Sequence, residues 1–76
     1  MTDRVSLEKQ IAEAGRELAL RKSFYPQQVG RGKMRQAEAD YLIANMEAIL
    51  ETLMWCRDNA DTIRKVHAAI REQSNV

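Results

Sequence analysis

The fold is decided by residues 21–35, which read RKSFYPQQVGRGKMR. This basic stretch holds the only proline of the chain, two of its three glycines and five basic residues, and it contains no acidic residue. Proline and glycine interrupt regular helices, whereas the sequence on both sides has the periodicity of a helix. The basic stretch is therefore predicted to be the turn at which the chain reverses direction.

The segment before the basic stretch is predicted to be an amphipathic helix over about residues 6–24. Asp3 or Ser6 is a candidate to cap it, because either side chain can accept a hydrogen bond from the first turn. Pro26 disfavours helical geometry at Tyr25, so we expect an ordered turn over residues 25–35. Apolar residues recur on one face of this helix: Leu7, Ile11, Ala14, Leu18 and Tyr25.

The segment after the basic stretch is predicted to be a second helix over about residues 36–56. Its apolar residues repeat at alternating steps of three and four, which is typical of a helix that packs along one face. These residues are Ala39, Leu42, Met46, Ile49, Leu53 and Cys56, broadened by Ile43, Leu50 and Met54. The same frame then continues through Ala60, Ile63, His67 and Ile70.

Two architectures fit this continued frame. One is an unbroken second helix of roughly 55 Å, whose C-terminal apolar residues would be exposed unless a second copy or another protein covered them. These residues are Ile63, Val66 and Ile70. In the other, Asp58 or Asn59 caps a third helix over about residues 59–72 that folds back. We favour the second: an all-α, antiparallel helical hairpin with a third C-terminal helix, in one small domain spanning residues 1–76. A dimer of the long helix is the alternative.

Length and composition narrow the class of protein. A chain of 76 residues has room for one small core. Its single cysteine, Cys56, cannot form an internal disulfide and fits a reducing compartment. We see neither a signal peptide nor an apolar run near the roughly 20 residues that span a bilayer. A cytoplasmic protein without membrane contact is expected.

No enzymatic constellation is apparent, and we expect no catalytic activity, cofactor or metal. The sequence Gly30-Arg31-Gly32-Lys33 superficially resembles a phosphate-binding loop, but it follows no strand and Lys33 precedes Met34 rather than Ser or Thr. His67 is the only histidine, and no second metal ligand accompanies it.

Charge is distributed unevenly, and this points to a binding surface. The basic stretch has a net charge of +5, whereas residues 36–56 contain four acids and no base. Basic residues beside aromatic ones can dock on an acidic protein surface or bind single-stranded nucleic acid. The predicted partner-binding residues are Arg21, Lys22, Tyr25, Arg31, Lys33, Arg35 and Trp55, with Tyr25 or Trp55 as the anchor.

Part of the sequence resembles short helical proteins encoded by many phages and prophages. The resemblance is carried by RELALR at residues 16–21, Tyr25-Pro26, QAEAD at residues 36–40 and MEAI at residues 46–49. Many such relatives have Thr or Ser before the QAEAD run, where this chain has Arg35. The resemblance implies a non-enzymatic phage protein in the host cytoplasm that binds a host complex, with RNA polymerase and its regulation or inhibition as the first candidate. A nucleic-acid-binding protein or a coiled-coil assembly element is the alternative, as a monomer or a homodimer.

Overall fold

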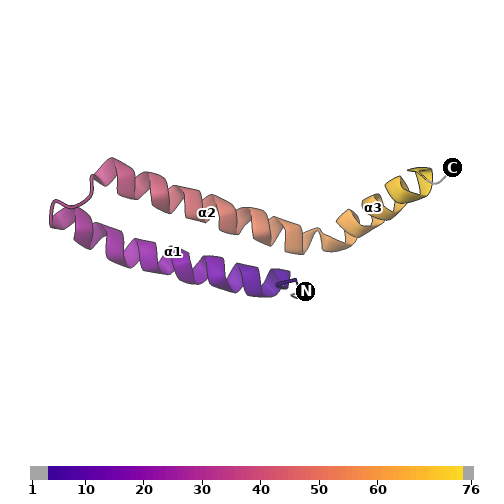
Figure 1. Ribbon diagram of the computed structural model, residues 1–76, viewed down its shortest axis with the longest axis horizontal. Helices are drawn as coiled ribbons and strands as arrows, with labels where there is room; N and C mark the ends of the chain where they lie inside the picture. Colours follow the sequence, from indigo (N-terminus) through magenta and orange to yellow (C-terminus); the bar gives the residue numbers. More distant parts are fainter. Residues whose placement is uncertain (1–3, 75–76) are drawn as a thin grey trace.

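A computed structural model describes residues 4–74 and consists of three helices joined by short connections (Figure 1). These are α1 (Leu7–Gly30), α2 (Gln36–Asp58) and α3 (Ala60–Ser74). The all-α prediction is confirmed. Ser6 is the N-cap of α1, and its hydroxyl oxygen accepts a hydrogen bond of 3.2 Å from the backbone N–H of Lys9. The other capping candidate, Asp3, lies outside the described residues.

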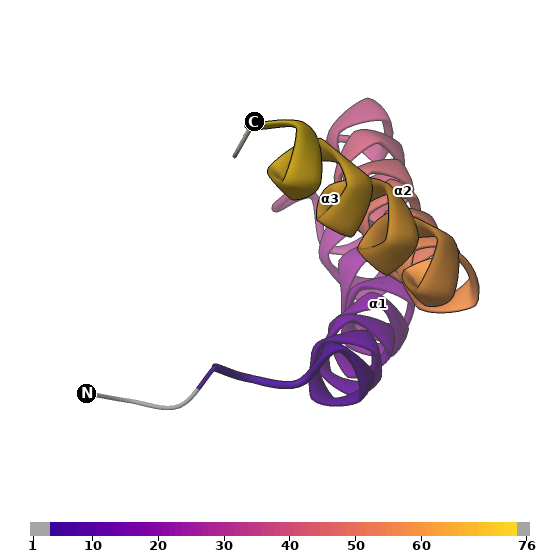
Figure 2. The same cartoon turned by 90° about the vertical axis from the view of Figure 1, so that its right-hand side faces the viewer.

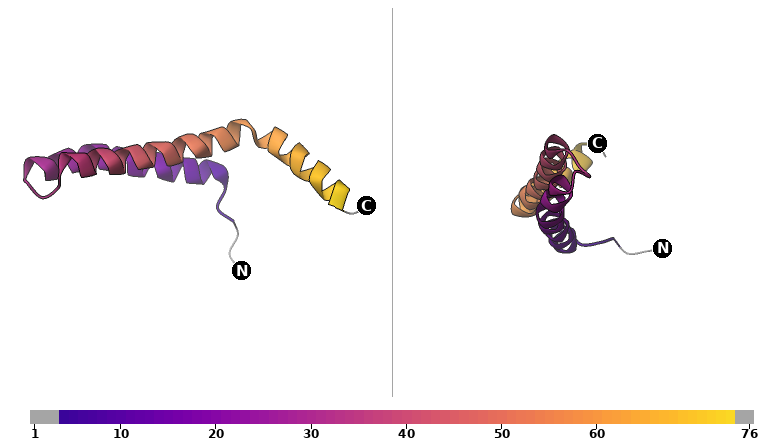
Figure 3. Two further views of the ribbon diagram at one scale, coloured as in Figure 1. Left: turned by 90° about the horizontal axis from the view of Figure 1, so that it is seen from above. Right: turned by 90° about the vertical axis from the view of Figure 1, so that its left-hand side faces the viewer.

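Helices α1 and α2 lie antiparallel and form the predicted hairpin (Figures 1 and 3). Their seam buries Ala14 from α1 and Ala39 and Met46 from α2. The remaining predicted apolar residues of the seam are half-buried, namely Leu7, Ile11, Leu18, Tyr25, Leu42, Ile43, Leu50, Leu53 and Cys56. Ile49 and Met54 are exceptions, since 50% and 38% of their surfaces are exposed. Two helices cover only a narrow strip of each other, so the core is thin.

The first helix extends beyond its predicted end near residue 24, because Pro26 lies inside α1 instead of in a separate turn. Proline has no N–H to donate to the carbonyl of Lys22, which costs up to about 3 kcal/mol in a helix interior. Its fixed φ is nevertheless helical, and one further turn allows Val29 to become half-buried. In this turn the Gln27 side chain donates a hydrogen bond of 3.3 Å to the carbonyl of Ser23. The connection therefore shrinks from the predicted residues 25–35 to residues 31–35.

A glycine cap ends α1 and reverses the chain. Gly32 has a left-handed backbone with a φ of 73°. Its N–H donates to the carbonyl of Val29 at 3.0 Å, and the N–H of Lys33 donates to the carbonyl of Gln28 at 2.9 Å. This pair of bonds is a Schellman motif, in which a residue with positive φ satisfies the last carbonyls of a helix. The first helix thus ends at this glycine cap and not before Pro26, where the sequence had predicted its end.

We had expected the third helix to fold back onto the hairpin, but it does not. Only Asn59 separates α2 from α3, and helical hydrogen bonds pass through it: its N–H donates to the carbonyl of Trp55 at 3.0 Å, and its carbonyl accepts from Ile63 at 2.9 Å. A reversal between helices needs a connection of about two to five residues. Helix α3 therefore continues outward at an angle to α2 (Figures 2 and 3).

The outward course of α3 makes the molecule long. Its principal extents are 62, 26 and 22 Å, and its radius of gyration is 18.1 Å. A compact domain of this length has a radius of gyration of about 11 Å. The structure thus combines the two predicted architectures, because the helix breaks at Asn59 and still leaves its C-terminal apolar residues exposed.

Candidate protein-binding site at the basic turn

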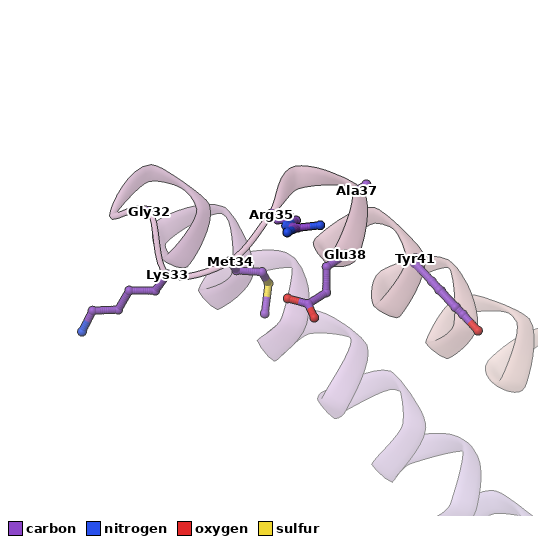
Figure 4. Close-up of a pocket in the computed structure, with 7 residues that line it drawn as sticks. All are labelled: Gly32, Lys33, Met34, Arg35, Ala37, Glu38 and Tyr41. Atoms are coloured by element: carbon purple, nitrogen blue, oxygen red, sulfur yellow. The ribbon is translucent and has the colours of Figure 1, made fainter.

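The turn between α1 and α2, which we call the basic turn, consists of residues 31–35 and presents three cations. Arg31, Lys33 and Arg35 are all exposed. Within residues 4–74, no ion pair involves any of the three. Figure 4 shows the Lys33 side chain pointing away from both helices. These cations are therefore accessible to an external anion.

A shallow hollow of about 670 Å³ lies beside the basic turn (Figure 4). Its lining consists of Gly32, Lys33, Met34, Arg35, Ala37, Glu38 and Tyr41. Met34 is half-buried, whereas 58% of the Tyr41 surface is exposed. Sequence reasoning missed Tyr41. The signal was available, because an aromatic residue that falls outside the apolar repeat of an amphipathic helix faces solvent.

The N-terminus of α2 adds to the positive character of the basic turn. Arg35 is its N-cap residue, and no side chain accepts a hydrogen bond there. The first N–H groups of a helix carry partial positive charge when they are uncapped. Glu38 lies in this first turn, while the carboxylate of Asp40 accepts a hydrogen bond of 2.9 Å from Gln36. A partner carboxylate would thus meet both cationic side chains and backbone donors.

Two of the predicted site residues instead hold the hairpin together. The guanidinium of Arg21 donates to the carbonyl of Leu42 at 2.8 Å and to the carboxylate of Glu17 at 3.0 Å. Lys22 lies 3.8 Å from the carboxylate of Glu47, across the two helices. These cations have partners inside the hairpin, so they are poorly placed to serve an external one.

The two predicted aromatic anchors are separated from the basic turn. Tyr25 is half-buried on α1, next to Phe24, whose ring centre lies 6.4 Å away. Trp55 is 60% exposed, but it lies 20 residues after Arg35 along α2, a distance of about 30 Å. The structure therefore brings Lys33 and Arg35 together with Tyr41 around one hollow. Arg31 lies in the same turn without lining the hollow, and Trp55 is not brought to it.

Other chemistry within residues 4–74 is sparse. No group of three His, Cys, Asp or Glu side chains is arranged to hold a metal ion. Cys56 is a free, half-buried thiol. The guanidinium of Arg16 donates a hydrogen bond of 2.7 Å to the carboxylate of Glu13, and this bond raises the pKa of Arg16. None of the helices in this range is both long and apolar enough to cross a bilayer.

No family model, no curated protein and no solved structure matches this chain. The resemblance to short phage proteins stays a prediction.

Proposed function

We propose that this protein is a non-enzymatic, phage-encoded regulator that binds an acidic surface of a host protein complex through the basic turn, with the host RNA polymerase as the first candidate. The observation that carries the proposal is the accessibility of Arg31, Lys33 and Arg35, which form no ion pair among residues 4–74. Arginine and lysine at such a position form charge-assisted hydrogen bonds with carboxylates. The resemblance to phage proteins supports the phage origin and the choice of a host machine.

A protein partner fits the charges of the molecule better than a nucleic acid does. Binding to nucleic acid gains affinity from many phosphate contacts at once, and the basic turn offers three cations. The helix that follows it carries the acidic residues Glu38, Asp40, Glu47 and Glu51. The basic surface is therefore confined to the turn and is too short to track an extended phosphate backbone. An exposed tyrosine beside arginine is instead typical of the centre of a protein interface. Tyr41 would be that anchor.

The proposal is tested by capturing the tagged protein from a host lysate and identifying the enriched proteins by mass spectrometry. Binding to purified host RNA polymerase is then measured directly. The double variant Arg31→Glu/Lys33→Glu should lose binding at least tenfold, because it places like charges against an acidic surface. The matched control is Arg16→Glu/Arg57→Glu, which changes the net charge equally at two exposed positions away from the basic turn. It should bind like the unaltered chain.

Three outcomes would contradict the proposal, and each has a different meaning. If both double variants captured the host protein equally, the basic turn would have no part in the interaction. Enrichment of no host protein at moderate salt would contradict the proposal as a whole. Mobility shifts of single- or double-stranded probes that weaken steeply with salt would instead establish nucleic acid as the partner.

A further inference from the structure

Helix α3 presents an apolar stripe to solvent. The stripe consists of Ile63, Val66 and Ile70, whose surfaces are 42%, 53% and 55% exposed. Every residue from 61 to 73 is exposed, and α3 approaches the rest of residues 4–74 only at its junction with α2. Helix α3 continues the hydrogen bonding of α2 through Asn59, but a helix gains most of its stability from the packing of its apolar face. A surface that covers the stripe would supply this packing.

An apolar groove on the hairpin has matching dimensions. It lies between α1 and α2, has a volume of about 590 Å³, and its apolar lining consists of Val5, Ala14, Met46, Ile49 and Leu53. Leu53 lies seven positions after Met46, and Ile70 lies seven positions after Ile63; each separation is about 10 Å along a helix. The α3 of the same chain does not reach this groove, because it extends away from the hairpin (Figures 1 and 2).

The chain exposes more surface than a compact monomer of the same mass would. Its accessible surface is 6454 Å², whereas a compact monomer of this mass exposes about 4,700 Å². The excess is about 1,700 Å². A stable interface of standard size needs about 800 Å² from each partner, so the excess is large enough to supply one side of such an interface.

We propose that two copies of this protein form a symmetric dimer in which the α3 stripe of each copy lies in the apolar groove of the other. The edges of both surfaces are charged, but Glu13 and Glu17 of the groove and Arg64 of α3 already form ion pairs within the chain. The contact therefore rests on its apolar residues and on the area available for it. The reciprocal exchange covers both apolar surfaces of each chain and turns two thin hairpins into one thicker core. It uses the end of the hairpin opposite the basic turn and does not depend on the function of that turn.

Sedimentation equilibrium of the full chain tests the dimer. The expected mass is twice the 8.7 kDa of one chain. Val66→Glu or Ile49→Glu should raise the dissociation constant about a hundredfold, because each substitution places two charges in the apolar contacts. The control is Ala68→Glu, at an exposed position on the opposite side of α3 from the stripe. A monomeric chain, or equal loss of dimer in the control, overturns the proposal.

Disulfide trapping tests the arrangement itself. Ile49→Cys and Val66→Cys are introduced together with Cys56→Ser. The two positions are 17 residues apart on α2 and α3, about 25 Å along the helices. A disulfide requires Cα atoms within about 7 Å, so it can form only between copies. Mild oxidation should give a covalent dimer of the paired variant and little of either single variant. Efficient linkage by Val66→Cys alone would show α3 against α3 and overturn the proposal.

Discussion

The guanidinium of Arg21 on α1 donates a hydrogen bond of 2.8 Å to the backbone carbonyl of Leu42 on α2. Only 24% of the Arg21 side chain is exposed, and its Nε also donates to Glu17 at 3.0 Å. This contact fixes the position of one helix along the other in the half of the hairpin that is nearer to the basic turn. A residue that sequence reasoning assigned to partner binding is therefore a structural link.

The Arg21→Gln variant should lower the free energy of unfolding by about 1–2 kcal/mol, because it removes a charge-assisted hydrogen bond between the helices. Urea unfolding followed by circular dichroism, at one fixed chain concentration, measures this change. Arg16→Gln is the control, since it removes an exposed ion pair within a single helix and should cost much less stability. Equal effects of the two substitutions would argue against a structural role for Arg21.

Substitution by alanine should change the stability of the protein in opposite directions at Gly32 and at Gly15. Gly32 has a φ of 73°, and the left-handed conformation costs other residues about 1–2 kcal/mol. Gly15 lies inside α1, and a Cβ atom there would have no neighbour within 4 Å. Gly32→Ala should therefore destabilise the protein by about 1–2 kcal/mol, whereas Gly15→Ala should stabilise it by up to about 1 kcal/mol. Thermal unfolding at matched concentration measures both changes, and a destabilising Gly15→Ala would reveal a close approach that the hairpin lacks.

Periodicity predicted the parts of the fold that depend on local pattern. The steps of three and four around Ala39 and Met46 correctly identified the buried face of α2. The predicted end of α1 was wrong because the rule for the residue before a proline is only a local preference. The burial of Val29 stabilises a further turn of the helix. The direction of α3 was misjudged because one intervening residue, Asn59, keeps the helical hydrogen bonds intact. The bond between Arg21 and the carbonyl of Leu42 was not foreseen, since no pattern in the sequence reveals a contact 21 residues away.

Tyr41 and Trp55 should contribute very differently to partner binding. Both are exposed aromatics, at 58% and 60%, but only Tyr41 lines the hollow beside the basic turn. If the basic turn is the binding surface, Tyr41→Ala should weaken binding to the captured host protein at least tenfold, in the range of interface anchors. Trp55→Ala should leave that affinity unchanged. If Trp55→Ala abolished binding and Tyr41→Ala did not, the binding surface would lie at the end of α2 that is distant from the basic turn.

Arg35 should show opposing effects on stability and on binding. It is the N-cap of α2 and supplies no side-chain hydrogen bond, while Glu38 occupies the third helical position. Arg35→Ser would complete a capping box with Glu38 and should raise the free energy of unfolding by about 1 kcal/mol. It also removes one cation of the basic turn, so affinity for the acidic partner should fall. Arg35→Ala is the control, because it removes the same charge without adding a cap: binding should fall equally, and stability should not rise. If Arg35→Ser bound as tightly as the unaltered chain, the positive charge at this position would have no part in recognition.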